Sequence, residues 1–375
     1  MKRLLSLVLA AGCAAGSVPQ TEGDAGPQAQ ADSGPVTTAS CRTDDDCDPG
    51  DVCVRDSCTG DSATEPDDAG TVPSDAGLIA LDAGLPADAG VLTVGADGGT
   101  VDLLDFVFTG DTRPVNCWTP ANDASNPYPS ASFQQIVARM AQLQPQFAFD
   151  LGDHMYECNE NLADAQTMMG KYTAALAGFQ PSWFMTMGNH ECGAGSTADC
   201  STRPSDANAT AYLAALSQIS KQPLPYYKVD VQTRLGLARF VFLADNWYSA
   251  AAQDWAESTL ADADLHAKYT FIVKHYPIAV ATGSLREGPP WSYNLITSGR
   301  HKYSLVLTAH THDYEHPTSA FGGRSVICGL GAANTRFAGF CRVQQQSDGS
   351  LKFTAYDLFG NVRTDASSTF AVTPQ

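Results

Sequence analysis

Basic residues are scarce in this chain of 375 residues, which has 22 Lys and Arg against 41 Asp and Glu and a formal net charge of −19. The imbalance is greatest near the start, where residues 21–100 contain 17 acidic and 2 basic residues. Residues 101–375 contain 24 acidic and 18 basic residues and are only mildly acidic. No cluster of Lys and Arg forms the basic patch that marks a nucleic-acid-binding surface. We therefore expect no nucleic acid among the partners.

Long apolar runs are also lacking. The run at 4–11 follows a short basic start and is too short to cross a bilayer, which is typical of a signal peptide. It ends in Ala10-Ala11-Gly12-Cys13, which resembles a bacterial lipobox. We expect residues 1–13 to be a lipoprotein-type signal peptide, with a lipid on Cys13 that anchors the protein to the outer membrane or cell surface. An ordinary secretory signal, which would release the protein to the periplasm or medium, is the alternative.

The aromatic residues Phe, Trp and Tyr all lie within residues 101–375. Residues 14–40 and 59–100 are rich in Asp, Ala, Gly, Pro and Ser, and Asp-Ala-Gly recurs within 68–90. Such a composition buries too little apolar surface to offset the entropy lost on ordering. We expect 14–40 to be disordered and 59–100 to be a solvated linker that holds the next domain away from a membrane.

Four cysteines (Cys41, Cys47, Cys53 and Cys58) fall within residues 41–58, between these two segments. So short a stretch, rich in Asp, Gly and Pro, cannot build an apolar core. Export favours oxidation, which predicts a module with two disulfides whose pairing and role stay open. Zinc is the alternative, although paired CxxC elements are missing.

The remaining part of the chain, 101–375, alternates between strand-like and helix-like patterns. Short apolar runs predict strands at 103–109, 147–151, 183–187, 227–231, 238–244, 269–273, 304–308 and 351–358. Helices are expected at 133–143, 161–179 and 251–263. This alternation predicts an α/β core, in which polar residues that follow the strands gather at one edge of a sheet.

Five polar clusters follow predicted strands. They are Gly110-Asp111-Thr112-Arg113, Gly152-Asp153-His154-Met155-Tyr156, Gly188-Asn189-His190-Glu191, Ile272-Val273-Lys274-His275 and Ala309-His310-Thr311-His312. A carboxylate can bridge two cations, imidazole suits iron and zinc, and a carboxamide oxygen suits a divalent ion. A phenolate suits ferric iron. If the strands lie side by side, these donors converge on a metal site.

The order of these clusters resembles that of the calcineurin-like metallophosphoesterases, and the tyrosine at 156 resembles the purple acid phosphatases. That branch has the motifs GDxG, GDxxY, GNH[DE], VxxH and GHxH. The resemblance covers 103–375 and implies a four-layer α/β/β/α sandwich. It also implies two metal ions: Fe(III) held by Asp111, Tyr156, His312 and a bridging Asp153, and Fe, Zn or Mn held by Asp153, Asn189, His275 and His310.

The activity that the resemblance implies is hydrolysis of phosphate monoesters in a phosphorylated small molecule. Two metal ions would neutralise the phosphate and activate water for attack. His190 is expected to orient the phosphate and protonate the leaving oxygen, and Glu191 to orient His190 or a neighbouring group. A phosphodiesterase or nucleotidase on the same scaffold is one alternative, and a catalytically inactive surface-binding lipoprotein is another.

Two positions depart from the purple acid phosphatase pattern. Arg113 stands where that branch has Gly and the wider superfamily often has a ligand His. Because Arg cannot ligate a metal, the first site depends on Tyr156, and Arg113 either contacts the substrate phosphate or forms a structural salt bridge. Ala309 replaces Gly before the His pair and adds one methyl group, which we expect to be tolerated.

The six cysteines of 101–375 are expected to form three disulfides. Cys192 and Cys200 flank a short loop after Glu191, and Cys328 and Cys341 can join two late strands. The remaining pair, Cys117 and Cys158, would tie together the loops that follow the first two motifs.

Overall fold

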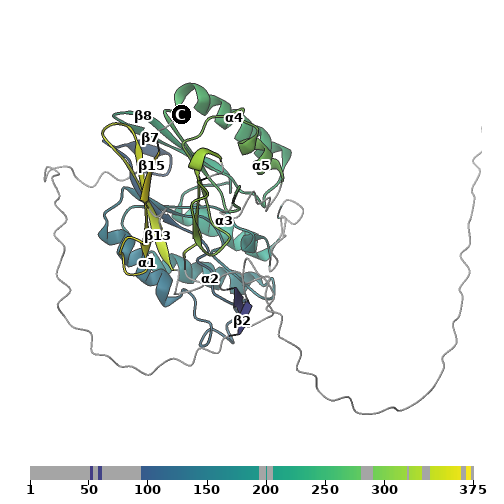
Figure 1. Ribbon diagram of the computed structural model, residues 1–375. Coiled ribbons are helices and arrows are strands. Elements are labelled where there is room, and N and C mark those ends of the chain that lie inside the picture. The colour runs from purple at the N-terminus through teal and green to yellow at the C-terminus, as the bar shows by residue number, and fades with distance from the viewer. Residues whose placement is uncertain are drawn as a thin grey trace, which may run out of the picture. The chain divides into compact units, whose positions relative to one another are not determined.

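The structure is a computed structural model, which describes residues 51–53, 58–60, 94–193, 200, 206–279, 290–318, 321–331, 338–364 and 369–372 (Figure 1). The expected signal peptide, Cys13 and the segment 14–40 lie outside these residues. In the cysteine-rich module, strands β1 (Asp51–Cys53) and β2 (Cys58–Gly60) pair antiparallel, and the cysteine pairing lies outside the described residues. No described helix has the length and apolar character needed to cross a bilayer.

A six-stranded sheet forms one half of the domain, in the order β15-β14-β13-β4-β5-β6. Its parallel part consists of β4 (Asp105–Thr109), β5 (Phe147–Asp150) and β6 (Ser182–Met185). Three antiparallel strands complete it: β13 (Gly339–Gln345), β14 (Leu351–Asp357) and β15 (Thr369–Val372).

A seven-stranded sheet forms the other half, in the order β11-β12-β10-β9-β8-β7-β3. The strands β8 (Gly236–Phe242), β9 (Tyr269–Val273), β10 (Leu305–Thr308) and β12 (Ser325–Cys328) run parallel. The edge strands are β11 (Tyr314–Glu315) and β3 (Gly98–Thr100), and β7 (Tyr227–Thr233) lies between β8 and β3. Because β3 pairs with β7, the ordered domain begins before residue 101, the start that the composition predicted.

The two sheets pack face to face through aromatic side chains. Phe106 of β4 makes edge-to-face contacts with Phe240 of β8 and Phe271 of β9, at ring-centre distances of 5.1 and 5.3 Å. Successive side chains of a strand point to opposite faces, so the next residue of β8, Val241, faces outward. It packs with Leu260 of helix α4.

Helices cover the outer face of each sheet, which gives the four-layer α/β/β/α sandwich that the motifs predicted (Figure 1). Over the six-stranded sheet lie α1 (Ala131–Gln142), α2 (Leu162–Ala175) and α3 (Ala207–Ile219). Over the seven-stranded sheet lie α4 (Ala250–His266) and α5 (Pro290–Thr297). The side chains of Ser130, Asn161, Asp206 and Ser249 accept backbone N–H bonds at the starts of α1 to α4, which explains where these helices begin.

The three disulfides expected in the domain are all present: Cys117–Cys158, Cys192–Cys200 and Cys328–Cys341. The first joins the loop after β4 to the loop after β5. Backbone bonds reinforce this junction, because the Trp118 amide donates to the Tyr156 carbonyl and the Cys158 amide to the Trp118 carbonyl. The loop that carries Tyr156 is therefore fixed to the loop that follows Arg113.

Candidate dinuclear metal centre

The predicted ligands lie at the carboxyl ends of five strands. Asp111 follows β4, Asp153 follows β5 and Asn189 follows β6, all in the six-stranded sheet. His275 follows β9, and His310 and His312 follow β10, in the seven-stranded sheet. Since the two sheets face each other, loops from both converge on one edge of the sandwich.

Sharp turns aim these side chains inward. Four of the predicted ligands have left-handed backbone angles: Asp111 at φ 59°, Asp153 at φ 58°, His310 at φ 74° and His312 at φ 52°. This conformation is uncommon for residues other than glycine and gathers where a structure needs a particular side-chain direction. The chain thus leaves each strand abruptly and places the ligand at its end.

Glycines make room for the carboxylates. A Cβ atom on Gly188 would lie 2.2 Å from Oδ1 of Asp153, and one on Gly329 would lie 2.3 Å from Oδ2 of Asp111. Gly188 belongs to the Gly-Asn-His-Glu motif. Gly329 lies in none of the five motifs, so the sequence analysis did not identify it. The methyl group of Ala309 is accommodated because it faces Gly110, where an added Cβ would lie 2.5 Å from it.

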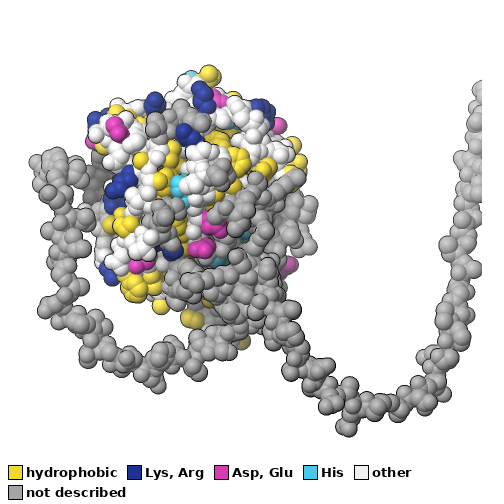
Figure 2. Space-filling model, viewed as in Figure 1, with side chains coloured by type: hydrophobic (Ala, Val, Ile, Leu, Met, Phe, Trp, Pro, Cys, Tyr) yellow, Lys and Arg dark blue, Asp and Glu magenta, His cyan; other side chains and the backbone are white. Residues whose placement is uncertain are grey.

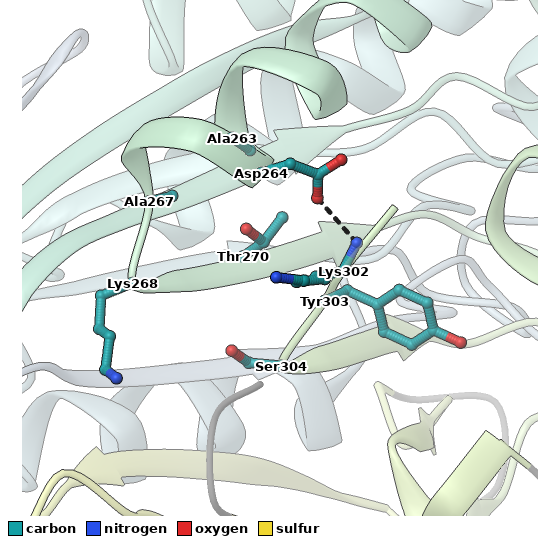
Figure 3. A pocket seen from close by; sticks show the side chains of 8 residues that line it. All are labelled: Ala263, Asp264, Ala267, Lys268, Thr270, Lys302, Tyr303 and Ser304. Carbon is teal, nitrogen blue, oxygen red and sulfur yellow. Dashed lines mark hydrogen bonds between the residues drawn. The ribbon is translucent and has the colours of Figure 1, made fainter. Parts of the chain in front are cut away.

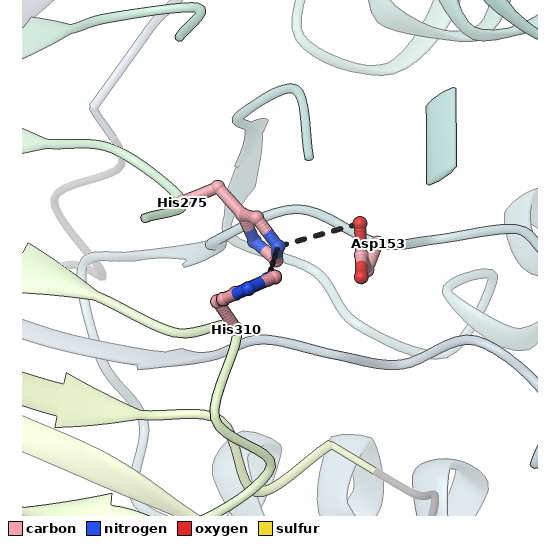
Figure 4. Close-up of side chains that lie close together, drawn as sticks. All are labelled: Asp153, His275 and His310. Carbon is pink, nitrogen blue, oxygen red and sulfur yellow. Dashed lines mark hydrogen bonds and ion pairs between the residues drawn. The ribbon is translucent and has the colours of Figure 1, made fainter. Parts of the chain in front are cut away.

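One group of ligand atoms comes from Asp153, Asn189, His275 and His310, which we call the second group. Oδ1 of Asn189 lies 3.0 Å from Nε2 of His275 and 3.1 Å from Nδ1 of His310, and these two nitrogens are 3.2 Å apart. Nε2 of His275 also lies 3.4 Å from Oδ1 of Asp153. Figure 4 shows Asp153, His275 and His310 pointing toward one another. All four side chains are buried.

The second group fits a metal ion as it stands. Nδ1 of His275 faces the Leu151 carbonyl at 2.9 Å, so in the neutral ring it donates there and leaves the Nε2 lone pair directed at the group. Burial alone favours the neutral ring, but the carboxylate of Asp153 raises the pKa of His275 to about 10 in the absence of metal. Burial likewise disfavours ionised Asp153, yet His275 and His190 hold its pKa well below the usual range.

The first group consists of Asp111, Asp153, His312 and the neighbouring Tyr156. One ligand atom from each of Asp111, Asp153 and His312 lies within 4.8 Å of the others. Oδ1 of Asp111 is buried and accepts no hydrogen bond from the described residues, while Nε2 of His312 lies 3.7 Å away. Asp153 belongs to both groups, as a bridging carboxylate must.

Arg113 lies inside the first group and is almost fully buried, at 1% exposure. Its Nη2 atom is 3.2 Å from Nε2 of His312, and its Nε atom is 3.6 Å from Oδ2 of Asp153. Its guanidinium carbon lies 4.8 Å from the centre of the Tyr156 ring. From the sequence, Arg113 was expected either to contact the substrate phosphate or to form a structural salt bridge. The structure shows a buried ion pair of Arg113 with Asp153. The first group therefore fits a metal only with this guanidinium displaced.

His190 stands beside Asp153, at the end of β6. Its backbone amide donates to Oδ1 of Asp153 over 3.0 Å, and its Nε2 atom lies 3.8 Å from Oδ2. The ring packs against Tyr156 with a centre-to-centre distance of 4.3 Å. The imidazole is thus held next to both groups.

Comparison with known proteins decides the family. The family model described as calcineurin-like phosphoesterase matches residues 104–314. The chain belongs to the calcineurin-like phosphoesterase family. No curated protein sequence matches it significantly.

Similar solved structures include GAP50 of Plasmodium, described as the anchor in the inner membrane complex, with a TM-score of 0.49 and 13% identity over 73% of this chain and 90% of that chain. A dimetal phosphatase from Danio rerio has a TM-score of 0.48 and 12% identity over 73% of this chain and 100% of that chain. The purple acid phosphatase PPD1 from yellow lupin has a TM-score of 0.49 and 14% identity over 72% of this chain and 54% of that chain.

Glu191, expected from the sequence to orient His190 or a neighbouring group, binds the backbone of two ligand loops. Its carboxylate accepts backbone N–H bonds from Gly188, Asp153, His154 and Met155, at 2.6 to 3.2 Å. It is fully buried, so it serves as a positioning residue that joins the loop of Asp153 to the loop of Asn189.

Lys274 and Asp245 are two further charged residues that hold the loop of His275 in the phosphoesterase site. Lys274, considered from the sequence as a phosphate or solvent contact, is buried and pairs with Asp245 at 3.1 Å. Burial lowers the pKa of Lys274, and Asp245 counteracts this effect. Asp245 also accepts the amide of Tyr276, so the pair holds both neighbours of His275. Asp245 was missed, although it follows the buried run of β8 as the other polar clusters follow their strands.

A separate small cavity of about 110 Å³ lies at the opposite ends of the strands (Figure 3). It is lined in part by Thr270 and Ser304, at the amino ends of β9 and β10, and by the end of α4. Lys268 and Lys302 reach it from the surface. Because the metal ligands follow the carboxyl ends of these strands, the cavity forms no part of the phosphoesterase site.

Proposed function

We propose that this protein is an exported, metal-dependent phosphatase that hydrolyses phosphate monoesters of small molecules. The observation that carries the proposal is that two groups of metal ligands share Asp153 while His190 lies 3.8 Å from the same carboxylate. Metal ions held there would supply positive charge for the phosphate and activate water for attack. Phosphate ester hydrolysis needs both that charge and a proton for the leaving oxygen.

The protein's own residues divide this work. Asn189, His275 and His310 present neutral donors, so that Asp153 supplies the negative charge of the second group. His190 is proposed to orient the phosphate and protonate the leaving oxygen, because its ring is fixed between Tyr156 and Asp153. Glu191 and the pair Lys274–Asp245 act through other residues by holding the ligand loops in place.

We further propose that the first group uses Tyr156 as a ligand to Fe(III), in the manner of the purple acid phosphatases, with Fe, Zn or Mn in the second group. The support is the place of the Tyr156 ring, beside Arg113 and His190 at the edge of the first group. A phenolate stabilises the ferric state and gives the complex a visible absorption band.

Export and lipid anchoring at Cys13 are also proposals. Their support is the basic and apolar start of the chain and the three disulfides of the domain, which are typical of oxidising compartments. The Asp-Ala-Gly-rich linker is proposed to hold the enzyme away from the membrane.

On the face seen in Figure 2, Lys and Arg side chains are scattered among acidic and apolar ones.

A comparison of two substrates tests the activity. The purified full-length protein, supplied with iron and zinc or with manganese, is assayed on nitrophenyl phosphate and on bis(nitrophenyl) phosphate. We expect the monoester to be hydrolysed faster. Faster turnover of the diester would favour a phosphodiesterase on the same scaffold. Failure to hydrolyse either ester with any of these metals would support an inactive surface-binding protein.

A further inference from the structure

Arg113 places a fixed positive charge among the residues of the first group. It contacts three of the four: His312 at 3.2 Å, Asp153 at 3.6 Å and the face of the Tyr156 ring at 4.8 Å. A guanidinium remains protonated in proteins and has donors but no acceptor. It can therefore satisfy metal ligands without ever becoming one.

The contact with His312 sets up a direct competition. Since the guanidinium can only donate, Nε2 of His312 must receive that hydrogen bond with its lone pair. A metal ion in the first group would need the same lone pair. Arg113 and the ion cannot both use it, and two cations so close in a buried site also repel each other.

Removing Arg113 from the group has a cost in the absence of metal. The guanidinium is 1% exposed, and the two carboxylates of the group, Asp111 and Asp153, are exposed by 0% and 1%. Buried carboxylates need compensating positive charge, and Arg113 is one cation that supplies it to Asp153, at 3.6 Å. A metal ion in the first group would supply positive charge to the same carboxylate of Asp153.

The second group lacks this competitor among its described contacts. Its ligand atoms on Asn189, His275 and His310 face one another at 3.0 to 3.2 Å. Lys274, the cationic residue next to His275 in the sequence, is directed away into its ion pair with Asp245. The two groups thus share Asp153 but differ in their neighbours: the first group contacts Arg113, a cation that can never become a ligand, whereas the residues of the second group are themselves ligands.

We propose that Arg113 is an internal cation that makes the first group the weaker of the two metal sites. The second group fills first, and the first group takes up an ion only when the guanidinium leaves His312 and Asp153. This inference rests on the proposed use of two metal ions and adds the order in which they bind. It also assigns to Arg113 the control of that order.

Zinc titration of the metal-free, full-length protein tests the order of binding. Binding is followed by calorimetry and by competition with a chromophoric chelator. For the wild type we expect one tightly bound ion per chain and a second bound at least about tenfold more weakly. His312→Ala should remove the weak step and keep the tight one, whereas Asn189→Ala should weaken the tight step.

Arg113→Met tests the role of the charge, because methionine keeps much of the length and removes the cation. We expect the gap between the two zinc affinities to close, with the weaker site gaining about tenfold or more. Arg342→Met is the matched control, since Arg342 pairs with Asp105 on the sheet away from the metal ligands. It should leave both steps unchanged.

Several outcomes would overturn the inference. Two zinc ions bound to the wild type with indistinguishable affinity would do so and leave the proposed phosphatase standing, as would an unchanged gap in Arg113→Met. If Arg113→Met does not fold without metal, the wild-type and His312→Ala titrations still decide. Absence of zinc binding to any variant, with no turnover of nitrophenyl phosphate, would instead refute the proposed function together with the inference.

Discussion

At the scale of single residues, the site depends on which side chains are acids, which are neutral donors and which are cations. Asp153 reaches both ligand groups because its two oxygens face different neighbours, Oδ1 toward His275 and Oδ2 toward Arg113 and His190. The motifs predicted this shared carboxylate. They did not predict that Arg113 would lie among the ligands of the first group, because sequence spacing does not show in which direction a long side chain points.

Tyr156 is the proposed ligand to Fe(III) in the first group. In protein loaded with ferric iron, we expect a visible charge-transfer band from the phenolate, and Tyr156→Phe should lose it because only the oxygen is removed. The absorption spectrum of each loaded protein checks this. Tyr128→Phe is a suitable control, since Tyr128 is a buried tyrosine that donates to the His154 carbonyl. A band that survives in Tyr156→Phe would exclude the tyrosine as a ligand.

His190 should separate catalysis from metal binding. We expect His190→Ala to lower kcat by about 10² to 10⁴, the usual contribution of a general acid. Its metal content should stay that of the wild type, because the ring belongs to neither ligand group. Elemental analysis alongside nitrophenyl phosphate kinetics makes the comparison. A variant that loses metal in proportion to its activity would show that His190 is a structural support instead.

At the scale of elements, the site is made by strands that end at one edge of the sandwich and by loops fastened to one another. Many strands and most helices could be predicted from apolar periodicity, as at β5 and α1, whereas the strands β12 and β13 were not predicted. The helix α3 was missed, although Asp206 caps it and Ala, Tyr and Leu recur at helical spacing. Short edge strands such as β3 and β11 were missed too, because few residues define them and their pairing depends on distant partners.

The loop that carries His275 depends on the buried pair Lys274–Asp245. We expect Lys274→Met to lower the free energy of unfolding by about 3–5 kcal/mol, because it leaves the carboxylate of Asp245 buried without its partner. Chemical denaturation of the metal-free protein measures this. Lys228→Met is the control: its pair with Asp230 is 42% and 25% exposed, and its loss should cost about 1 kcal/mol or less. Equal losses in the two variants would contradict this role.

At the scale of the whole molecule, the chain combines a phosphoesterase sandwich with an acidic leader of a different composition. The sandwich was predictable only through the order of its motifs, because apolar patterns alone indicate an α/β core and leave the number of sheets open. The aromatic packing of Phe106 on Phe240 and Phe271 joins the two sheets face to face. It brings ligands from both sheets to one edge, so a shared metal centre is a property of the complete domain.

The most direct test of the central claim compares metal content and phosphatase activity in wild type and Asp153→Asn. The asparagine keeps the shape of the shared ligand but cannot bridge two cations as a carboxylate does. We predict that the wild-type protein, supplied with iron and zinc or with manganese, binds metal and hydrolyses nitrophenyl phosphate. Asp153→Asn should lose metal from both groups and fall to the rate of metal-free protein. Full metal content and an unchanged rate in Asp153→Asn would contradict the account.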